Sequence, residues 1–158
     1  MTDARFEDGA ERALNLRAET VDDLAVVATL VQDCVFPVTE LKWDTGSRKL
    51  AFLINRFRWE DKSAAEAENR PYERVQSLLV LSDVTRVRSQ GFDRGDKDLV
   101  LSILDLSWEA QEDTTGRLVV TLAGDGAIMA EAEALCLDLR DVTRPYRAVS
   151  GAAPKHAD

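Results

Sequence analysis

The sequence predicts an α+β fold that is mainly antiparallel β: a bent sheet or small barrel or sandwich of about seven to eight strands, with one N-terminal amphipathic helix. Apolar residues recur at helical spacing in one secure segment, whereas most later segments alternate with a period of two. Short turn-forming stretches separate those segments, as antiparallel connections allow and parallel connections do not. Bending the sheet also protects exposed strand edges.

The first part of the globular region predicts a short strand and then the helix. Residues 13–18 alternate apolar and polar side chains. Thr20 precedes Asp23 by three residues, so the Thr20 hydroxyl can cap the start of a helix. The Asp23 carboxylate is favourable there because the N-terminal end of a helix carries a partial positive charge. Apolar residues then recur at three- and four-residue steps, at Leu24, Val27, Ala28, Val31 and Val35. Pro37 stops the helix because proline has no amide hydrogen to donate.

Successive hairpins are predicted after the helix. Residues 35–43 and 48–60 have strand character and flank 44–47, a turn-rich tetrapeptide. Residues 61–71 carry charge and little core material, which indicates a surface loop with room for one helical turn. Further strands are predicted at 74–81, 84–89, 99–108 and 117–123.

The last segment of the predicted sheet, residues 127–140, is ambiguous. Its Ala and Glu residues favour a helix by propensity. However, residues 124–126 read Gly-Asp-Gly, a tight turn that follows a strand and suits a hairpin. We therefore expect a strand, with a helix as the alternative.

The length and the net charge of the chain limit the classes of protein to which it can belong. The 158 residues fit one domain, which we expect over 13–148, with a flexible leader at 1–12 and a flexible tail at 149–158. The net charge of −9 disfavours nucleic acid and anionic membranes, since affinity for phosphates comes from Lys and Arg. No stretch approaches the ~20 apolar residues of a membrane span, and no secretory signal is visible. We therefore expect a cytoplasmic protein.

Few residues suit catalysis or metal binding. The single histidine, His156, lies in the expected tail, where it cannot hold catalytic geometry. Cys34 and Cys136 form no CxxC pair and predict reduced thiols, with a disulfide or redox pair as the alternative. No phosphate loop, nucleophile elbow or zinc motif occurs. The sequence thus predicts no catalytic residue, no metal site and no cofactor.

The densest group of candidate ligand-binding residues lies in the segment from Asn55 to Glu60. In one interpretation Arg56 and Arg58 bind an anionic ligand and Trp59 forms a wall, because guanidinium groups suit carboxylates and phosphates. In the interpretation that we favour, the aromatic residues join the core and the arginines pair with nearby acids. Asn55 stands among apolar neighbours and needs hydrogen-bond partners if it is buried.

Asp105 and Trp108 complete the candidate set. Asp105 is the one charge in the apolar run 99–108, so a buried carboxylate there would need a partner. Residues 38–60 and 84–109 show a faint similarity that aligns Arg56 with Asp105 and Trp59 with Trp108, consistent with a hairpin duplication or with convergence. The alignment predicts an ion pair between Arg56 and Asp105.

The remaining charged groups suit solvated surface better than a site. The aspartates of residues 93–98 fail the calcium-loop pattern, because Arg94 occupies a ligand position and no bidentate Glu follows. Glu131 and Glu133 would share a strand face and add to the acidic surface. Arg86, Arg88 and Arg94 are the candidates for nucleic-acid contact, and Arg56 and Arg58 form a second basic group, but acidic residues surround both groups.

Four segments carry a family resemblance. They read DDLAVVATLVQDCV, FLINRFRWED, YERVQSLLVLSDV and GDGAIMAEAEALCLDLRDV. Together they resemble a small bacterial family known as domain of unknown function 2948, over about residues 14–145. The resemblance implies a bacterial cytoplasmic protein with a single domain. It implies no activity and no site residues, because none is assigned to the family.

Two functional hypotheses follow. The first is a non-enzymatic cytoplasmic domain that binds a partner protein or a second copy of itself, through sheet edges and the region of Trp59 and Trp108. The second is a protein that binds a small anionic ligand, or a carboxylate-based enzyme, with Asn55, Arg56, Arg58 and Asp105 as polar groups.

Overall fold

The computed structural model describes residues 13–148 and 153–154, and most of its residues in regular elements belong to β-strands. The predicted leader at 1–12, most of the predicted tail and His156 lie outside the described residues. The strands are β1 (Asn15–Ala18), β2 (Val35–Pro37), β3 (Leu41–Asp44), β4 (Lys49–Phe57), β5 (Glu73–Leu81), β6 (Val84–Gln90), β7 (Val100–Ala110), β8 (Gly116–Leu122), β9 (Ala127–Ala132), β10 (Leu137–Asp141) and β11 (Tyr146–Arg147). The helices are α2 (Val21–Val31) and α3 (Lys62–Ala67), with short 3-10 turns η1 (Val38–Glu40) and η2 (Trp59–Asp61).

All strand pairs are antiparallel, which confirms the predicted sheet class. The sheet is open, with the order β1-β10-β5-β4-β2-β7-β8-β9-β6, while β3 pairs with β4 and β11 with β5. The described residues contain eleven strands rather than the expected seven to eight. The predicted number was too low because the segments 35–43 and 127–140 each contain two strands, and because the two-residue strand β11 is too short to show a period-two pattern.

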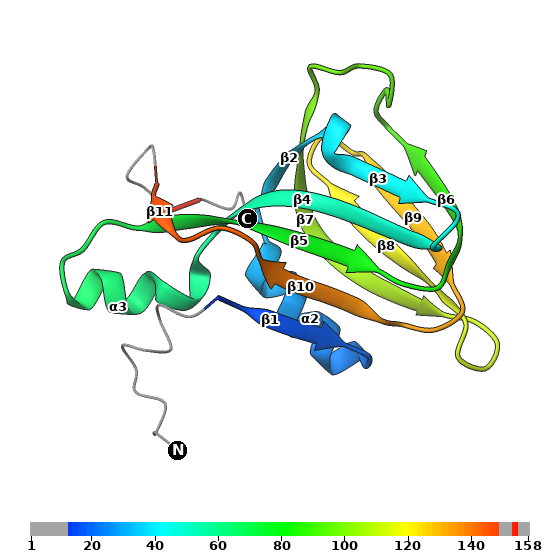
Figure 1. Ribbon diagram of the computed structural model, residues 1–158, viewed down its shortest axis with the longest axis horizontal. Helices are drawn as coiled ribbons and strands as arrows, with labels where there is room; N and C mark the ends of the chain where they lie inside the picture. The colour runs from blue at the N-terminus through cyan, green and yellow to red at the C-terminus, as the bar shows by residue number, and fades with distance from the viewer. Residues whose placement is uncertain (1–12, 149–152, 155–158) are drawn as a thin grey trace.

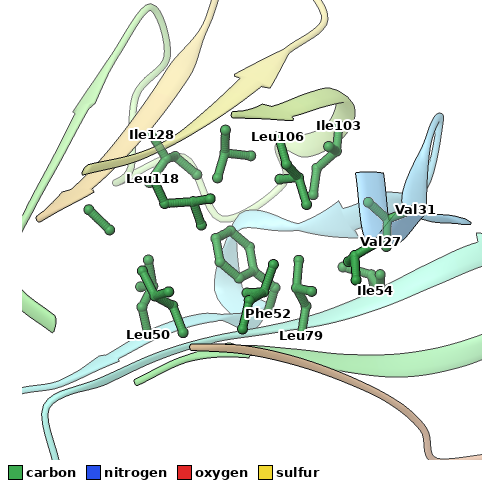
Figure 2. Packing of buried hydrophobic residues seen from close by; sticks show 14 of the residues in the cluster. Val27, Val31, Leu50, Phe52, Ile54, Leu79, Ile103, Leu106, Leu118 and Ile128 are labelled. Atoms are coloured by element: carbon green, nitrogen blue, oxygen red, sulfur yellow. The ribbon is translucent and has the colours of Figure 1, made fainter. Parts of the chain in front are cut away.

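The sheet folds over on itself into two layers that enclose the core (Figure 1). One layer, which we call layer A, contains β1, β10, β5, β4 and β3; the other, layer B, contains β7, β8, β9 and β6. The short strand β2 joins them, because it pairs with β4 and with β7. Figure 2 shows Leu50, Phe52 and Leu79 of layer A facing Leu106, Leu118 and Ile128 of layer B.

Helix α2 covers one end of the space between the layers (Figure 1). The Thr20 hydroxyl accepts a hydrogen bond from the Asp23 amide at 3.1 Å, the geometry of an N-cap. The helix ends at Val31, before Pro37, because the chain reverses through Asp33 in a left-handed conformation. Val35 therefore starts β2 instead of extending the apolar face of the helix.

The hairpin predicted around residues 44–47 is present as β3–β4, with Asp44 paired to Lys49. Its first strand is shorter than predicted, since η1 interrupts residues 35–43 and separates β2 from β3. Residues 127–140 are extended as expected, in two strands, β9 and β10, that belong to different layers. The loop predicted at 61–71 contains α3, which lies away from the two layers (Figure 1).

The second hairpin of the proposed duplication does not form. β6 pairs with β9 at the end of the sheet, and β7 pairs with β2 and β8. After β5 the chain crosses from layer A to layer B through Asp83, which has a φ of 58°. The similarity between 38–60 and 84–109 therefore reflects alternating composition rather than equivalent hairpins.

Candidate functional site

Four of the six candidate residues, Asn55, Arg56, Arg58 and Trp59, lie at the end of β4 and just beyond it. Arg56 is fully buried there. Its Nη1 and Nη2 donate to the two carboxylate oxygens of Glu60, each at 2.8 Å. Its Nη2 also donates to both oxygens of Asp141 on β10, at 3.0 and 3.1 Å. Each oxygen of Glu60 and Asp141 thus accepts a hydrogen bond from Arg56.

Ser77 on β5 completes this group, which we call the Arg56 cluster: Arg56, Glu60, Ser77 and Asp141. Arg56, Ser77 and Asp141 are buried, whereas Glu60 is partly exposed. The Ser77 hydroxyl donates to Asp141 at 2.7 Å and accepts from Arg56 Nε at 3.0 Å. Burial by itself would lower the pKa of Arg56, but its hydrogen bonds and charge attraction to the two carboxylates outweigh burial and raise it. The guanidinium therefore stays charged, and the cluster ties β4, β5 and β10 to η2.

Further ion pairs lie next to the cluster and hold the connection between β4 and β5, which contains α3. Arg58 pairs with Glu73, and the buried Asp61 accepts two hydrogen bonds from Arg70, at 3.1 and 3.2 Å. Arg58 also lies 3.8 Å from Asp61. These contacts bear out the interpretation in which the arginines pair with acids. They differ from it in being buried rather than on the surface.

Asn55 and Trp59 have structural partners as well. The Asn55 side chain accepts a hydrogen bond from Arg74 Nε and donates one to the Tyr146 hydroxyl at 2.7 Å. The Trp59 indole donates to the Gln32 carbonyl at 3.1 Å, and its ring lies edge-on to Phe57. A role for these residues in ligand binding stays a prediction.

Asp105 and Trp108 lie in the other layer, so the six candidates do not form one site. The predicted ion pair between Arg56 and Asp105 is wrong. A β-bulge between Ile103 and Asp105 shifts the register of β7, so Ile103 and Leu106 face the core while Asp105 is exposed. Trp108 packs against the core and covers Gly116 on the neighbouring strand.

The structure contains a groove that sequence reasoning missed, on the outer face of layer A. It has a volume of about 490 Å³ and crosses β1, β10, β5, β4 and β3, which lie side by side in Figure 1. Its apolar floor is formed by Ala51, Leu78 and Val80. Four cations line it, Arg17, Lys42, Lys49 and Arg140, together with Asn15, Asp44, Ser47 and Asp138. We call this site the layer A groove.

The charge of the layer A groove is opposite to that of the chain. Four cationic and two anionic side chains give a net charge of +2, against −9 for the whole sequence. Both acids are engaged: Asp138 accepts from Arg17 at 2.9 Å, and Asp44 accepts from the Ser47 hydroxyl at 2.7 Å. The hydrogen bonds from Ser47 and Gly46 lower the pKa of Asp44.

Three cations of the groove keep their charge available. Within the part of the chain that the structure describes, no carboxylate lies within 4.0 Å of the charged groups of Lys42, Lys49 or Arg140. All three residues are exposed. The signal in the sequence was weak, because the lysines and Arg140 lie almost 100 residues apart and only strand pairing brings them to one face.

Several other charged residues of the described chain lie beside residues of opposite charge. On the outer face of layer B, Glu109, Arg117, Glu131 and Arg86 lie opposite one another in successive strands and alternate in sign. Glu133 pairs with Arg48. Asp93 accepts a hydrogen bond from the Gly95 amide within its own loop. Glu131, Glu133 and Asp93, which the sequence assigned to the solvated surface, thus have local partners.

The two thiols do not form a further candidate site in the described part of the chain. Cys34 and Cys136 are both free, and burial raises the pKa of the Cys34 thiol to about 12. Residues 13–148 and 153–154 contain no group of three or more His, Cys, Asp or Glu side chains placed to hold a metal ion. Nor do they contain a helix long and apolar enough to cross a membrane.

Comparison with known proteins places nearly the whole chain in one family. The family described as Protein of unknown function (DUF2948) matches residues 14–156. No curated protein and no solved structure matches the chain.

Proposed function

Since this chain belongs to DUF2948 and that description assigns no activity, we propose a function from its own surface: a non-enzymatic domain that binds an anionic partner protein in the layer A groove. The observation that carries the proposal is the set of unneutralised cations, Lys42, Lys49 and Arg140, around an apolar floor. We expect this domain to act in a bacterial cytoplasm.

Charge complementarity supports the choice of partner. The surface of a protein with a net charge of −9 repels acidic molecules, whereas the lining of the layer A groove has a net positive charge. The half-buried floor residues Leu78 and Val80 offer apolar contact beside the charges. A polar rim around an apolar centre is the usual composition of a protein interface.

The Arg56 cluster is better suited to support than to catalysis. Both oxygens of each carboxylate accept hydrogen bonds from Arg56, which occupies the lone pairs that a general base would need. The cluster links β4, β5 and β10, three of the strands that form the groove. Its role in the proposal is to keep those strands in register.

Binding of a small anionic ligand in the same groove is the second candidate. A volume of about 490 Å³ is within the range of small-molecule sites, roughly 300–1,000 Å³. A thermal-shift screen against anionic metabolites tests this candidate, because a specific ligand raises the melting temperature by mass action. A shift that persists in the groove variants below would place that ligand elsewhere.

The test of the proposed function is capture of partners from extracts of the native cell. The baits are the wild type, the double variant Lys42→Glu/Arg140→Glu and the control Arg88→Glu, which reverses an exposed cation on β6 in layer B. We expect one reproducible partner with the wild type and with the control, and its loss with the double variant. Retention by the double variant would contradict the proposal.

A further inference from the structure

We infer that the layer A groove binds an extended acidic segment that runs across the strands, with a carboxylate at each end of an apolar centre. The inference rests on the proposed function and deepens it by naming the chemistry of the partner segment. It follows from the register of the strands, which places the cations of the groove at two opposite sides of the floor.

Strand pairing defines one row of side chains that crosses layer A. Asp138 on β10 lies opposite Arg17 on β1 and Val80 on β5, and Ala51 on β4 lies opposite Val80 and Lys42 on β3. The row therefore has a cation at each end and apolar side chains near its middle. Four spacings between neighbouring strands, each about 4.8 Å, make the row roughly 19 Å long.

Two poles of charge follow from this row. Arg140 lies two residues along β10 from Asp138, on the same face of the sheet, so β1 and β10 form one pole. Because Asp138 neutralises Arg17, the available charge of this β1 pole is Arg140. The β3 pole contains Lys42 and Lys49, whose nearest acid in the groove, Asp44, is held by its own turn.

An extended peptide fits the distance between the poles. Arg140 and Lys42 lie three strand spacings apart across the sheet and two residues apart along it, roughly 16 Å in all, and the row from Arg17 to Lys42 is roughly 19 Å long. An extended backbone advances about 3.3 Å per residue, so these distances correspond to about five to six residues. Side chains at positions i, i+2, i+4 and i+6 of an extended chain point to the same side. Carboxylates at i and i+6 then reach the two poles, while apolar side chains at i+2 and i+4 lie over Val80 and Ala51.

The experiment compares two peptides of equal composition on the full-length, 15N-labelled chain by NMR. The spaced probe is Glu-Ser-Leu-Ser-Val-Ser-Glu, and the clustered probe is Glu-Glu-Ser-Leu-Ser-Val-Ser, both with blocked ends. We expect the spaced probe to shift the amide signals of both poles, and the clustered probe to shift one pole and to bind about fivefold more weakly, the cost of one exposed ion pair.

Variants test each pole separately. Lys42→Glu and Arg140→Glu should each weaken the spaced probe about fivefold or more and erase its preference over the clustered probe. Arg88→Glu, on the opposite layer, should bind both probes as the wild type does. All three positions are exposed, and unchanged amide spectra away from the substitution check that the fold is retained.

The outcomes separate the inference from the proposed function. Equal binding of the two probes in the groove overturns the spacing and leaves the proposed function in place. Absence of shifts in the groove with both probes also overturns the inference, and if Lys42→Glu/Arg140→Glu still captures the cellular partner, the proposed function falls with it. Shifts outside the groove assign the acidic segment to another surface and contradict both.

Discussion

At the scale of single residues, Arg56 has the greatest structural consequence. It is fully buried and binds two carboxylates, of which the Asp141 side chain is 2% exposed and the Glu60 side chain 21%. A buried ion pair contributes little compared with an apolar pair, but removal of one partner leaves a buried charge without compensation. Arg56 therefore stabilises the fold mainly by compensating the buried Asp141 carboxylate.

Removing Arg56 alone should therefore cost more than removing the pair. We expect Arg56→Met to lower the free energy of unfolding by about 3–5 kcal/mol, because the buried Asp141 side chain loses the cation that compensates it. The double variant Arg56→Met/Asp141→Leu should recover at least half of that loss. Urea denaturation followed by fluorescence measures both. A double variant at least as unstable as Arg56→Met would contradict this account of the cluster.

The two thiols should differ in reactivity. Burial raises the pKa of Cys34 to about 12, so at pH 8 its thiol is protonated as well as inaccessible. Burial also raises the pKa of Cys136, but this residue is only partly buried. With Ellman's reagent at pH 8 we expect Cys136 to react first and Cys34 only as fast as the protein unfolds. Equal rates in the native protein would contradict the placement of Cys34.

At the scale of secondary-structure elements, the contact between β7 and β8 depends on a glycine. Gly116 lies beneath the indole of Trp108, where an added Cβ would overlap the ring. We expect Gly116→Ala to destabilise the protein by about 1–3 kcal/mol, the usual cost of overpacking. Gly46→Ala is the control, because a Cβ there meets only Asp44 Oδ1, at 3.4 Å. Thermal unfolding measures the stability of both variants. An equal loss of stability in Gly116→Ala and Gly46→Ala would contradict the role of Trp108.

Elements that depend on neighbouring residues were predictable from the sequence. The cap at Thr20, the turn at 44–47 and the reversal at 124–126 each rest on a few adjacent side chains. The bulge in β7 was not predictable, because it changes which face Asp105 occupies without a marker such as glycine. That one-residue shift explains why the expected partner of Arg56 was wrong.

At the scale of the whole molecule, strand order decides which residues meet. Arg56 and Asp141 are 85 positions apart, and β4 and β10 become neighbours of β5 only once the sheet has formed. The layer A groove combines cations from β1, β3, β4 and β10 in the same way. Period-two alternation predicted an antiparallel sheet but not its order. The pairing of Arg56 with nearby acids was therefore predictable, but its partner Asp141 and the layer A groove were not.

The central claim is that the outer face of layer A binds anions. Its most direct measurement is the map of amide shifts on the full chain titrated with a blocked peptide of ten glutamates at low salt. We expect shifts that are concentrated at Lys42, Lys49 and Arg140 and that decline as salt is raised, because the contacts are exposed and screened. Shifts centred on Arg88 and β6, or no shifts, would contradict it.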